Sequence, residues 1–307
     1  MPKFSIIVNC LNGEDFLSRS LDSIYNQTFK DWEIIFYDNN STDNSAEIAK
    51  SYGKKLNYFK SEKTFPLGRA RSDAIRLASG EFIAYLDVDD VWKENKLEVQ
   101  NSILMNDLIS FTFTNTLITD DQGYSFELFK YSHPERGHIF KELLKRDFIP
   151  TSSIAIKQSA ILQLDQTYEH SLTLECDRDF ILRLSNQFEC DYTEMCLTER
   201  FIHSDNTIYK ENHASFHELD FLKDKISKIA SNSSIEKKEI ERFVANIDEK
   251  IARSYWNIGE KKKARKIFKQ HIDFNRHKLL FLLTFILPQR INMQALSSWI
   301  RKVRRVK

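Results

Sequence analysis

The sequence is poor in cysteine, and we expect no segment of it to direct the chain out of the cell. Its four cysteines, Cys10, Cys176, Cys190 and Cys196, form no Cys-x-x-Cys pair and show no zinc-like spacing with histidine. The N-terminus has no basic segment followed by a long apolar run and a small-residue cleavage site. We therefore expect reduced thiols in a cytoplasmic protein.

Long apolar runs are nearly absent as well. The only one covers residues 279–287, is interrupted by Thr284 and is closed by Pro288. It is well short of the roughly 20 residues that a membrane-spanning helix needs. The sequence therefore predicts no segment that crosses a membrane.

Acidic residues are missing from the C-terminal end. No Asp or Glu follows Asp273, so residues 274–307 have a formal charge of +8 in a chain whose net charge is +1. The small net charge argues against a nucleic-acid-binding protein. The basic, apolar tail favours peripheral contact with the inner, anionic face of a membrane, or with a lipid-linked molecule. A helical hairpin buried against the rest of the protein is the other interpretation, and both stay open.

What the sequence does contain is a regular alternation of strand and helix signals over residues 1–110. Short apolar runs at residues 4–8, 32–37, 56–59 and 82–86 predict strands. Apolar residues at helical spacing predict a helix in each connection. This alternation predicts an α/β fold with a mostly parallel sheet and helices on both of its faces.

The signals change in the rest of the chain. Residues 108–118 predict a strand that pairs with residues 124–129 through a turn, and residues 154–156 predict a further short strand. Residues 180–184 open a helix behind an acidic cluster. From His217 onward the sequence is helical and charged, so we expect a helical C-terminal extension.

Three carboxylates follow the strand predicted at residues 82–86. Asp87, Asp89 and Asp90 come directly after this apolar run, and a buried strand tolerates no unpaired charge. They must therefore lie at its carboxyl end, where parallel α/β sheets bind ligands. Oxygen ligands at this density suit Mg²⁺ or Mn²⁺ carrying a phosphate better than Zn²⁺. A dense hydrogen-bond network is the alternative.

Two further strand ends carry polar loops. Residues 9–14 follow the first predicted strand, and Asp38 ends the second. Each has an ordinary explanation by itself, a turn at Asn12-Gly13 and helix capping near Asp38. Because the carboxyl ends of parallel strands meet at one edge of a sheet, we expect these groups to lie beside residues 87–90.

The order of these motifs resembles that of the family 2 glycosyltransferases. The resemblance is carried by residues 5–14, 21–28, 32–35, 37–43, 68–71 and 85–90. It implies the A-type glycosyltransferase fold, a Rossmann-like, mostly parallel mixed sheet flanked by helices. The catalytic domain would cover residues 1–212, with a nucleotide-sugar half at 1–110 and an acceptor half at 111–212. Residues 213–307 would form the helical extension.

The resemblance also implies a donor and a metal ion. The donor would be a nucleotide-diphosphate sugar, with a UDP-sugar as the first choice, and the metal would be Mn²⁺ or Mg²⁺. Asp87 and Asp89 would be the family's Asp-x-Asp pair, with Asp89 on the metal. The positions that match the family's donor-binding residues are Asn9, Leu11, Glu14, Asp38, Arg71 and Asp87.

In this family the catalytic base is an aspartate in a Glu-Asp pair ahead of a helix. Alignment on residues 182–184 places Asp177 at the base position and Cys176 where the family usually has glutamate. Asp179 is a competing base, and an acidic helix N-terminus stabilised by the helix dipole is the structural alternative. His203 resembles the histidine that completes the metal or diphosphate site in many members, a role that suits a neutral imidazole.

The resemblance thus implies a metal-dependent, inverting glycosyltransferase that transfers a sugar to a hydroxyl group of a cell-surface glycan or a lipid-linked acceptor. A sugar-phosphate nucleotidyltransferase is an alternative. It would usually carry a Gly-rich, basic loop, whereas residues 9–14 contain one glycine and an acid. A non-catalytic nucleotide-sugar-binding scaffold is the third hypothesis, and the departure at Cys176 supports it.

Overall fold

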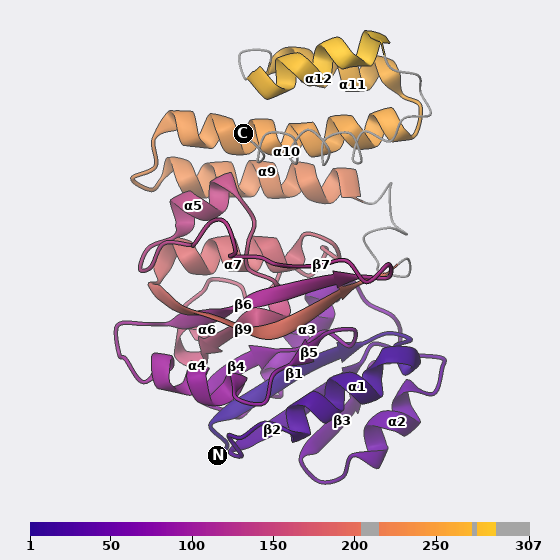
Figure 1. The fold of residues 1–307 in the computed structure, drawn as a ribbon, viewed down its shortest axis with the longest axis vertical. Coiled ribbons are helices and arrows are strands. Elements are labelled where there is room, and N and C mark those ends of the chain that lie inside the picture. The colour runs from indigo at the N-terminus through magenta and orange to yellow at the C-terminus, as the bar shows by residue number, and fades with distance from the viewer. Residues whose placement is uncertain (204–214, 272–274, 287–307) are drawn as a thin grey trace. The chain divides into compact units, whose positions relative to one another are not determined.

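The computed structural model describes residues 1–203, 215–271 and 275–286. The chain divides into two compact units, Met1–Lys210 and Glu211–Lys307 (Figure 1). Of the basic tail predicted at residues 274–307, only 275–286 belong to the described residues. The remainder of that prediction, which includes Trp299 and the last basic residues, lies outside them.

The first unit is built on one sheet, of which four neighbouring strands are parallel. They lie in the order β3-β2-β1-β4. The strands are β1 (Phe4–Cys10), β2 (Trp32–Asp38), β3 (Leu56–Lys60) and β4 (Phe82–Tyr85), and the helices between them are α1 (Glu14–Tyr25), α2 (Ser45–Ser51) and α3 (Leu67–Arg76). The alternation predicted for residues 1–110 is confirmed.

The other half of the sheet is mixed. Beyond β4 the order continues β8-β6-β9-β5, in which only β6 and β9 are parallel. These strands are β5 (Val91–Trp92), β6 (Phe111–Asp120), β8 (Ile154–Lys157) and β9 (Cys190–Ile202), with β7 (Ser125–Glu127) paired to β6, and the helices are α4 (Lys96–Leu104), α5 (Phe140–Lys145), α6 (Gln158–Leu162) and α7 (Cys176–Gln187). The hairpin of β6 with β7 agrees with the sequence prediction.

β9 has no counterpart among the predicted strands. Its sequence lacks a clean alternation of apolar and polar residues, and the middle of the strand is partly exposed. The pairing with β6 also shifts register between Thr114 and Thr116, so the period of two is interrupted. Since β9 ends at Ile202, this strand is what delivers His203 to the edge of the sheet.

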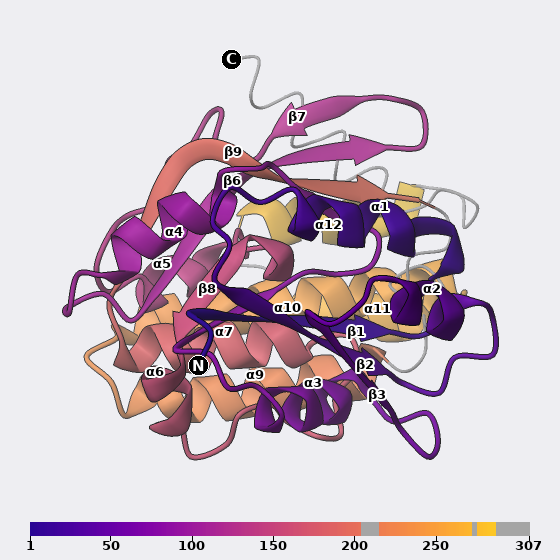
Figure 2. The same ribbon diagram turned by 90° about the horizontal axis from the view of Figure 1, so that it is seen from below.

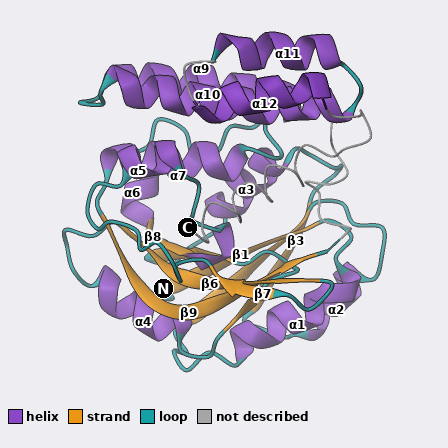
Figure 3. Ribbon diagram, turned by 45° about the horizontal axis from the view of Figure 1, so that its top comes forward, coloured by secondary structure: helices purple, strands orange, loops and turns teal. Residues whose placement is uncertain are grey.

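α1 packs on the sheet through side chains at helical spacing. Leu17, Leu21 and Ile24 are fully buried against the alternate side chains of β1 from Phe4 to Val8. α1, α2 and α4 lie on this face of the sheet, and α3, α6 and α7 lie on the other (Figures 2 and 3). The loops at the carboxyl ends of β1, β2 and β4 therefore gather at one edge, between the two helical layers.

The second unit is helical, as predicted. Its described helices are α9 (Ser215–Ser231), α10 (Lys237–Asn257), α11 (Lys261–Gln270) and α12 (Asn275–Ile286). The turn between α10 and α11 contains Gly259, whose φ is +94°, a conformation that glycine adopts without strain. Trp256, Phe268 and Leu280 join α10, α11 and α12 in one apolar cluster. None of the described helices combines the length and the apolar character needed to cross a bilayer.

Gly68 lies where α3 begins, against the backbone of the segment before α7. Its N–H donates to the Leu172 carbonyl oxygen at 2.9 Å, and a Cβ at this position would lie 2.1 Å from the carbonyl oxygen of Glu169. Alanine in a helix is normally more stable than glycine by about 0.5–1 kcal/mol. Here the Cβ would overlap a backbone atom, so the sign should reverse.

We expect Gly68→Ala to lower the free energy of unfolding by about 1–3 kcal/mol, as overpacking substitutions do. Urea denaturation measures the effect. Arg76→Ala, at the exposed other end of α3, is the control and should change the free energy by less than about 0.5 kcal/mol. An unchanged or higher stability of Gly68→Ala would contradict the packing of α3 described above.

Candidate active site

Asp87, Asp89 and Asp90 lie in a tight loop at the carboxyl end of β4. The N–H of Asp90 donates to the carbonyl oxygen of Asp87 at 3.1 Å, which closes a turn. α1 fixes the backbone of this loop. Arg19 Nη2 donates to the carbonyl oxygen of Asp89 at 3.0 Å, and the Ser20 hydroxyl donates to that of Asp87 at 3.4 Å. The three carboxylates therefore stand at the exit of the strand, where the sequence places them.

A single buried arginine joins this loop to α7. Arg71, on α3, is 1% exposed, and its Nη2 donates to Asp87 Oδ1 and to Asp177 Oδ2, both at 2.9 Å. Its Nε also lies 2.7 Å from Asp177 Oδ1. The planar fork of a guanidinium group suits such two-sided pairing with carboxylates. The structure thus brings together three residues that the sequence predicts for one site.

The pKa of Asp177 is set by burial and by the opposing charges of Arg71 and Asp87. Burial raises the pKa of Asp177, and the nearby charge of Asp87 raises it further, whereas Arg71 and a hydrogen bond with Thr151 lower it. The net result is a pKa above the ordinary aspartate value. A carboxylate of this kind is a better proton acceptor at neutral pH than an exposed aspartate, because its pKa lies closer to the working pH.

Asp179, the competing base, occupies a different environment. It is fully buried and forms an ion pair with Arg183 at 2.8 Å, and Arg183 in turn donates to the carbonyl oxygen of Thr167 at 2.7 Å. This pair attaches α7 to the segment before it. The Asp177 side chain keeps 23% of its surface exposed, so of the two it is the one that a substrate can reach.

α7 begins earlier than the sequence suggests. The helix starts at Cys176 instead of near residue 180, so Asp177 lies in its first turn. Cys176, which stands where the related family has glutamate, is fully buried. Glu175 precedes the helix and lies 3.6 Å from Arg178. An acidic first turn is favourable by itself, because the helix dipole stabilises negative charge there.

His203 and Asp89 form a second cluster. His203 Nε2 lies 3.3 Å from Asp89 Oδ2, and the imidazole stacks on the ring of Phe16 with the centroids 4.4 Å apart. Burial raises the pKa of Asp89, as does the charge of Asp87, while His203 lowers it. An opposite charge nearby favours the ionised form of a carboxylate, so a cation beside Asp89 would stabilise it.

These side chains fit a metal ion only as part of a larger ligand set. Among the described residues, no group of three or more His, Cys, Asp or Glu side chains is arranged to hold a metal by itself. Mg²⁺ and similar ions in phosphate-transfer sites usually take one or two carboxylates and complete their shell with water and substrate phosphates. Asp89 and His203, which the resemblance assigns to such a site, lie 3.3 Å apart.

Asp90 ties the carboxylate loop to two other elements. It is 2% exposed, and its Oδ2 accepts a hydrogen bond from the Ser152 hydroxyl at 2.5 Å, while its Oδ1 accepts one from the Phe201 N–H at 3.3 Å. Ser152 Oγ also accepts the N–H of Asp87 at 3.0 Å. Since Phe201 lies two residues before His203, Asp90 holds the end of β9 against the loop that carries Asp89.

Hydrogen bonds join the loop after β1 to the segment after β2. The N–H of Gly13 donates to Ser45 Oγ at 2.9 Å, and the N–H of Thr42 donates to Asn12 Oδ1 at 2.8 Å. Asn12 has a φ of +55°, which asparagine tolerates better than most residues. A Cβ on Gly13 would lie 3.1 Å from the side chain of Val88, so this loop also touches the carboxylate loop.

Asp38 is buried beneath the second of these loops. Its Oδ1 accepts the Ser41 N–H at 2.7 Å, and its Oδ2 accepts the Tyr58 hydroxyl at 2.6 Å. The pKa of Tyr58 is raised by burial and by this carboxylate. Because each carboxylate oxygen has two lone pairs, Asp38 retains acceptor capacity beyond these two bonds.

The other predicted donor-site residues differ in their surroundings. Both amide atoms of Asn9 are buried and have no hydrogen-bond partner among the described residues, while Leu11 is 47% exposed. Glu14 Oε2 accepts the N–H of Asn44 at 2.9 Å and its side-chain amide at 2.6 Å. The Asn9 amide therefore has unused hydrogen-bonding capacity and Leu11 is accessible from solvent, whereas Glu14 holds the start of α2.

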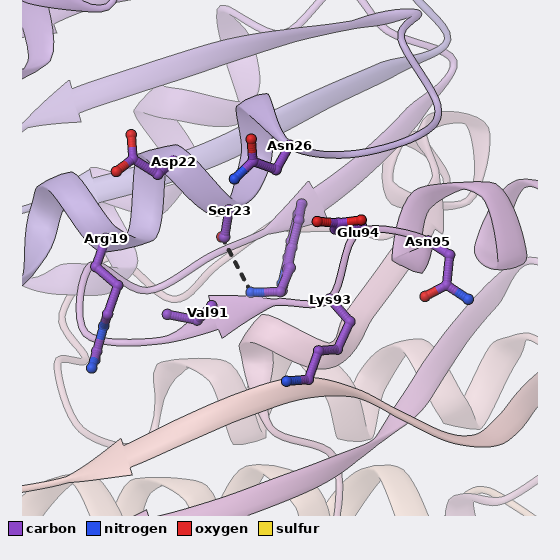
Figure 4. A pocket seen from close by; sticks show the side chains of 9 residues that line it. Arg19, Asp22, Ser23, Asn26, Val91, Lys93, Glu94 and Asn95 are labelled. Carbon is purple, nitrogen blue, oxygen red and sulfur yellow. Dashed lines mark hydrogen bonds between the residues drawn. The ribbon is translucent and has the colours of Figure 1, made fainter.

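A hollow of about 700 Å³, whose lining includes none of these carboxylates, lies between α1 and β5 (Figure 4). Its lining is Arg19, Asp22, Ser23, Asn26, Val91, Trp92, Lys93, Glu94 and Asn95. None of the residues predicted for the site takes part in it. Arg19 is the link between the two places, because it lines the hollow and donates to the carbonyl oxygen of Asp89.

The sequence did not predict that Thr151, Ser152 and Phe16 would contact the site residues. Thr151 and Ser152 lie in a short 3₁₀ helix (Thr151–Ser153) and contact Asp177, Asp87 and Asp90. Their only signal in the sequence is the polar run after Pro150. Nothing in the spacing of Phe16 on α1 indicates that its ring stacks on His203.

Comparisons with known proteins point to one family. The sequence model of Glycosyl transferase family 2 matches residues 5–161. The chain is 35% identical over 120 residues to the Escherichia coli UDP-Glc:alpha-D-GlcNAc-diphosphoundecaprenol beta-1,3-glucosyltransferase WfgD, covering 39% of this chain and 47% of that protein. It is 30% identical over 200 residues to the uncharacterized glycosyltransferase MJ1057 of Methanocaldococcus jannaschii, covering 63% and 68%. The chain thus spans about half the length of WfgD.

Solved structures support the fold at low sequence identity. S. aureus TarS 1-349 in complex with UDP-GlcNAc superposes with a TM-score of 0.68 at 16% identity, covering 88% of this chain and 80% of that one. The Pyrobaculum calidifontis mannosyltransferase PcManGT in complex with GDP-Man and Mn²⁺ gives a TM-score of 0.58 at 12% identity, covering 92% and 84%. Both likenesses concern the arrangement of the sheet and helices.

Proposed function

Because the chain belongs to glycosyl transferase family 2, we propose that it transfers a sugar from a nucleotide-diphosphate sugar to a hydroxyl group of a cell-surface glycan or a lipid-linked acceptor. The observation that carries this proposal is the bridge of Arg71 between Asp87 and Asp177. It connects a carboxylate at the end of β4, where nucleotide ligands bind in such sheets, to a carboxylate whose pKa is raised by burial, a shift in the direction that favours a general base.

The donor is assigned to the loops at the ends of β1, β2 and β4. In this proposal the base and ribose lie against Asp38, Asn9 and Leu11, and Asp87 contacts the ribose or a bound water. The buried, unpartnered amide of Asn9 supports this placement, because a ligand would supply the missing hydrogen bonds. A UDP-sugar is the first choice, since TarS, a structural neighbour, was solved with UDP-GlcNAc. Glu14 would act only through α2.

The metal is assigned to Asp89 and His203. Mn²⁺ or Mg²⁺ bound there would neutralise the charge that develops on the diphosphate leaving group. The charge of Asp87 near Asp89 supports a cation at this position. Mn²⁺ is also present in the structure of PcManGT, a neighbour in fold.

The acceptor side is assigned to Asp177. In this proposal Asp177 takes the proton of the attacking hydroxyl in a single displacement, which inverts the configuration at the sugar carbon. Arg71 lowers the pKa of this carboxylate, which favours its ionised form, and orients it. We place the catalytic domain at residues 1–212 and the helical extension at residues 213–307. A lipid-linked acceptor, such as the one in the name of WfgD, would bring the protein to a membrane surface.

Donor binding is the first test. We expect UDP-sugars with Mn²⁺ to raise the free energy of unfolding by about 2.7 kcal/mol at a hundred times the dissociation constant. Asp89→Asn should remove most of the Mn²⁺-dependent part, because a neutral amide is a weak metal ligand. Thermal melting with a panel of nucleotide sugars measures this, and Asp107→Asn at an exposed position is the control. Equal stabilisation of the Asp89→Asn variant would remove Asp89 from the metal site.

Transfer is the second test and separates the alternatives. Incubation of the best donor with a GlcNAc-diphosphate-undecaprenol acceptor should release UDP and extend the lipid-linked sugar. Release of pyrophosphate from a nucleoside triphosphate and a sugar phosphate would indicate a nucleotidyltransferase instead. Tight donor binding without transfer to any acceptor would indicate the scaffold.

A further inference from the structure

α12 has an apolar face that is exposed among the described residues of the second unit. Leu280 and Thr284 are each 1% exposed and pack inward, whereas Leu279, Leu282 and Phe285 are 36%, 51% and 60% exposed. The three exposed residues are three positions apart, so they form one row along the helix. We call this row the α12 ridge. Contiguous apolar side chains on a surface are characteristic of sites that bind a partner or a membrane.

α11, beside α12 in Figure 1, carries a high density of positive charge. All six of its charged residues are Lys or Arg, and Lys262, Lys266 and Lys269 are exposed. No ion pair joins these three lysines to an acidic residue among the described parts of the chain. They recur at intervals of four and three, which places them on one face of the helix. We call them the α11 lysines.

Arg265 places the α11 lysines next to the α12 ridge. It lies three residues after Lys262 and four before Lys269, on the same side of α11. Its Nη2 donates to the Thr284 carbonyl oxygen at 2.6 Å, and its guanidinium carbon lies 4.3 Å from the centroid of the Phe285 ring. The charged and the apolar row therefore border each other on adjacent helices.

We propose that the α12 ridge and the α11 lysines form one surface that binds an anionic lipid bilayer. The ridge would enter the boundary between headgroups and acyl chains, and the lysines would lie among the phosphates. The charge supports a bilayer over a second copy of this chain, since residues 261–286 hold eight Lys and Arg against one Asp and would repel their own copy. The apolar ridge argues against a nucleic acid, whose surface is a row of phosphates.

This inference extends the proposed function, because a lipid-linked acceptor resides in a bilayer, but its test uses neither donor nor acceptor. We would measure flotation of the full chain with vesicles of phosphatidylcholine alone and with added phosphatidylglycerol. Binding should be much stronger with phosphatidylglycerol and should weaken as salt is added. A failure here would leave sugar transfer unaffected, so the two proposals fail separately.

Two sets of variants test the surface itself. Exchange of the three α11 lysines for glutamate should weaken binding to phosphatidylglycerol vesicles by roughly 100-fold, because each basic residue near such a surface contributes about a factor of five. Leu279→Ser with Leu282→Ser should weaken it by roughly tenfold and should not alter the salt dependence. The same charge exchange at Lys228, Lys237 and Lys238, exposed on α9 and α10, is the matched control.

Three outcomes would overturn the proposal. The first is no flotation of the wild type, or equal flotation with both kinds of vesicle. The second is an equal loss for the α11 lysines and for the control lysines, which would indicate an effect of net charge alone. The third is a dimer, measured by sedimentation, that the two serine substitutions dissociate while vesicle binding stays unchanged. Melting curves verify that every variant is folded.

Discussion

Replacing Asp177 by asparagine is expected to lower the turnover rate by roughly 10³-fold, within the range of 10²–10⁴ that general-base catalysis contributes. Asparagine keeps the shape of the side chain but cannot accept the proton of the acceptor hydroxyl. Donor binding should change little, because Arg71 still pairs with Asp87 at 2.9 Å. The measurements are steady-state release of UDP with a saturating acceptor and thermal melting with the donor.

The matched control is Asp179→Asn two residues away. Asp179 is fully buried with Arg183, so its loss should destabilise the protein while the folded fraction keeps its turnover rate. The opposite pattern, in which Asp179→Asn abolishes turnover and Asp177→Asn does not, would exchange the two roles. In the wild type, the rate should fall on the acid side at a pH above the ordinary aspartate pKa, since the pKa of Asp177 is raised by burial and by Asp87.

The strand ends of the first half were predictable from sequence because each signal there is local. Asp38 and Asp87 come at the ends of apolar runs, because an unpaired charge is costly in the middle of a buried strand. The parallel order of the strands then brings the ends together without any further information. The position of a carboxylate at the end of an apolar run does not predict which groups it will pair with. Asp38 accepts hydrogen bonds from Ser41 and Tyr58, and the second of these comes from β3.

The other half of the site depends on long-range contacts that carry no local pattern. Arg71 and Asp177 are 106 positions apart, and Asp90 and Phe201 are 111 apart. β9, which brings Phe201 and His203 to the site, is irregular in its pairing with β6 and shows no clean alternation. The family resemblance assigned Asp177 and His203 by position, but only the packing of α3, α7 and β9 on the sheet relates them to Asp87 and Asp89.

The bridge by Arg71 leads to the second large effect. Arg71→Met would leave two carboxylates facing each other without their cation. Breaking a buried pair in this way costs about 3–5 kcal/mol. We expect a loss of unfolding free energy near the lower end, about 3 kcal/mol, because the side chains of Asp87 and Asp177 keep 39% and 23% of their surface exposed. Urea denaturation at neutral pH measures the loss.

The loss should depend on pH with a definite sign. Burial and the charge of Asp87 raise the pKa of Asp177, and without Arg71 the main opposing influence is gone, so its folded-state pKa rises further above the unfolded value. Such a group contributes stability below its unfolded pKa and loses that contribution as the pH rises through its folded pKa. The free energy of unfolding of the Arg71→Met variant should therefore be close to that of the wild type in acid and lower than that of the wild type near neutral pH.

In the Arg71→Met variant, the fall of the rate in acid should begin at a higher pH than in the wild type, because the pKa of Asp177 would be higher without Arg71. Arg71→Lys keeps the charge but cannot reach both carboxylates with a planar fork, so it should restore part of the stability and less of the rate.

In the double variant Arg71→Met with Asp177→Asn, the repulsion between Asp87 and Asp177 is removed. The combined loss of stability should therefore be smaller than the sum of the two single losses. If the acid side of the Arg71→Met profile coincides with that of the wild type, Arg71 does not control the ionisation of the base, and its contacts with Asp87 and Asp177 serve folding alone.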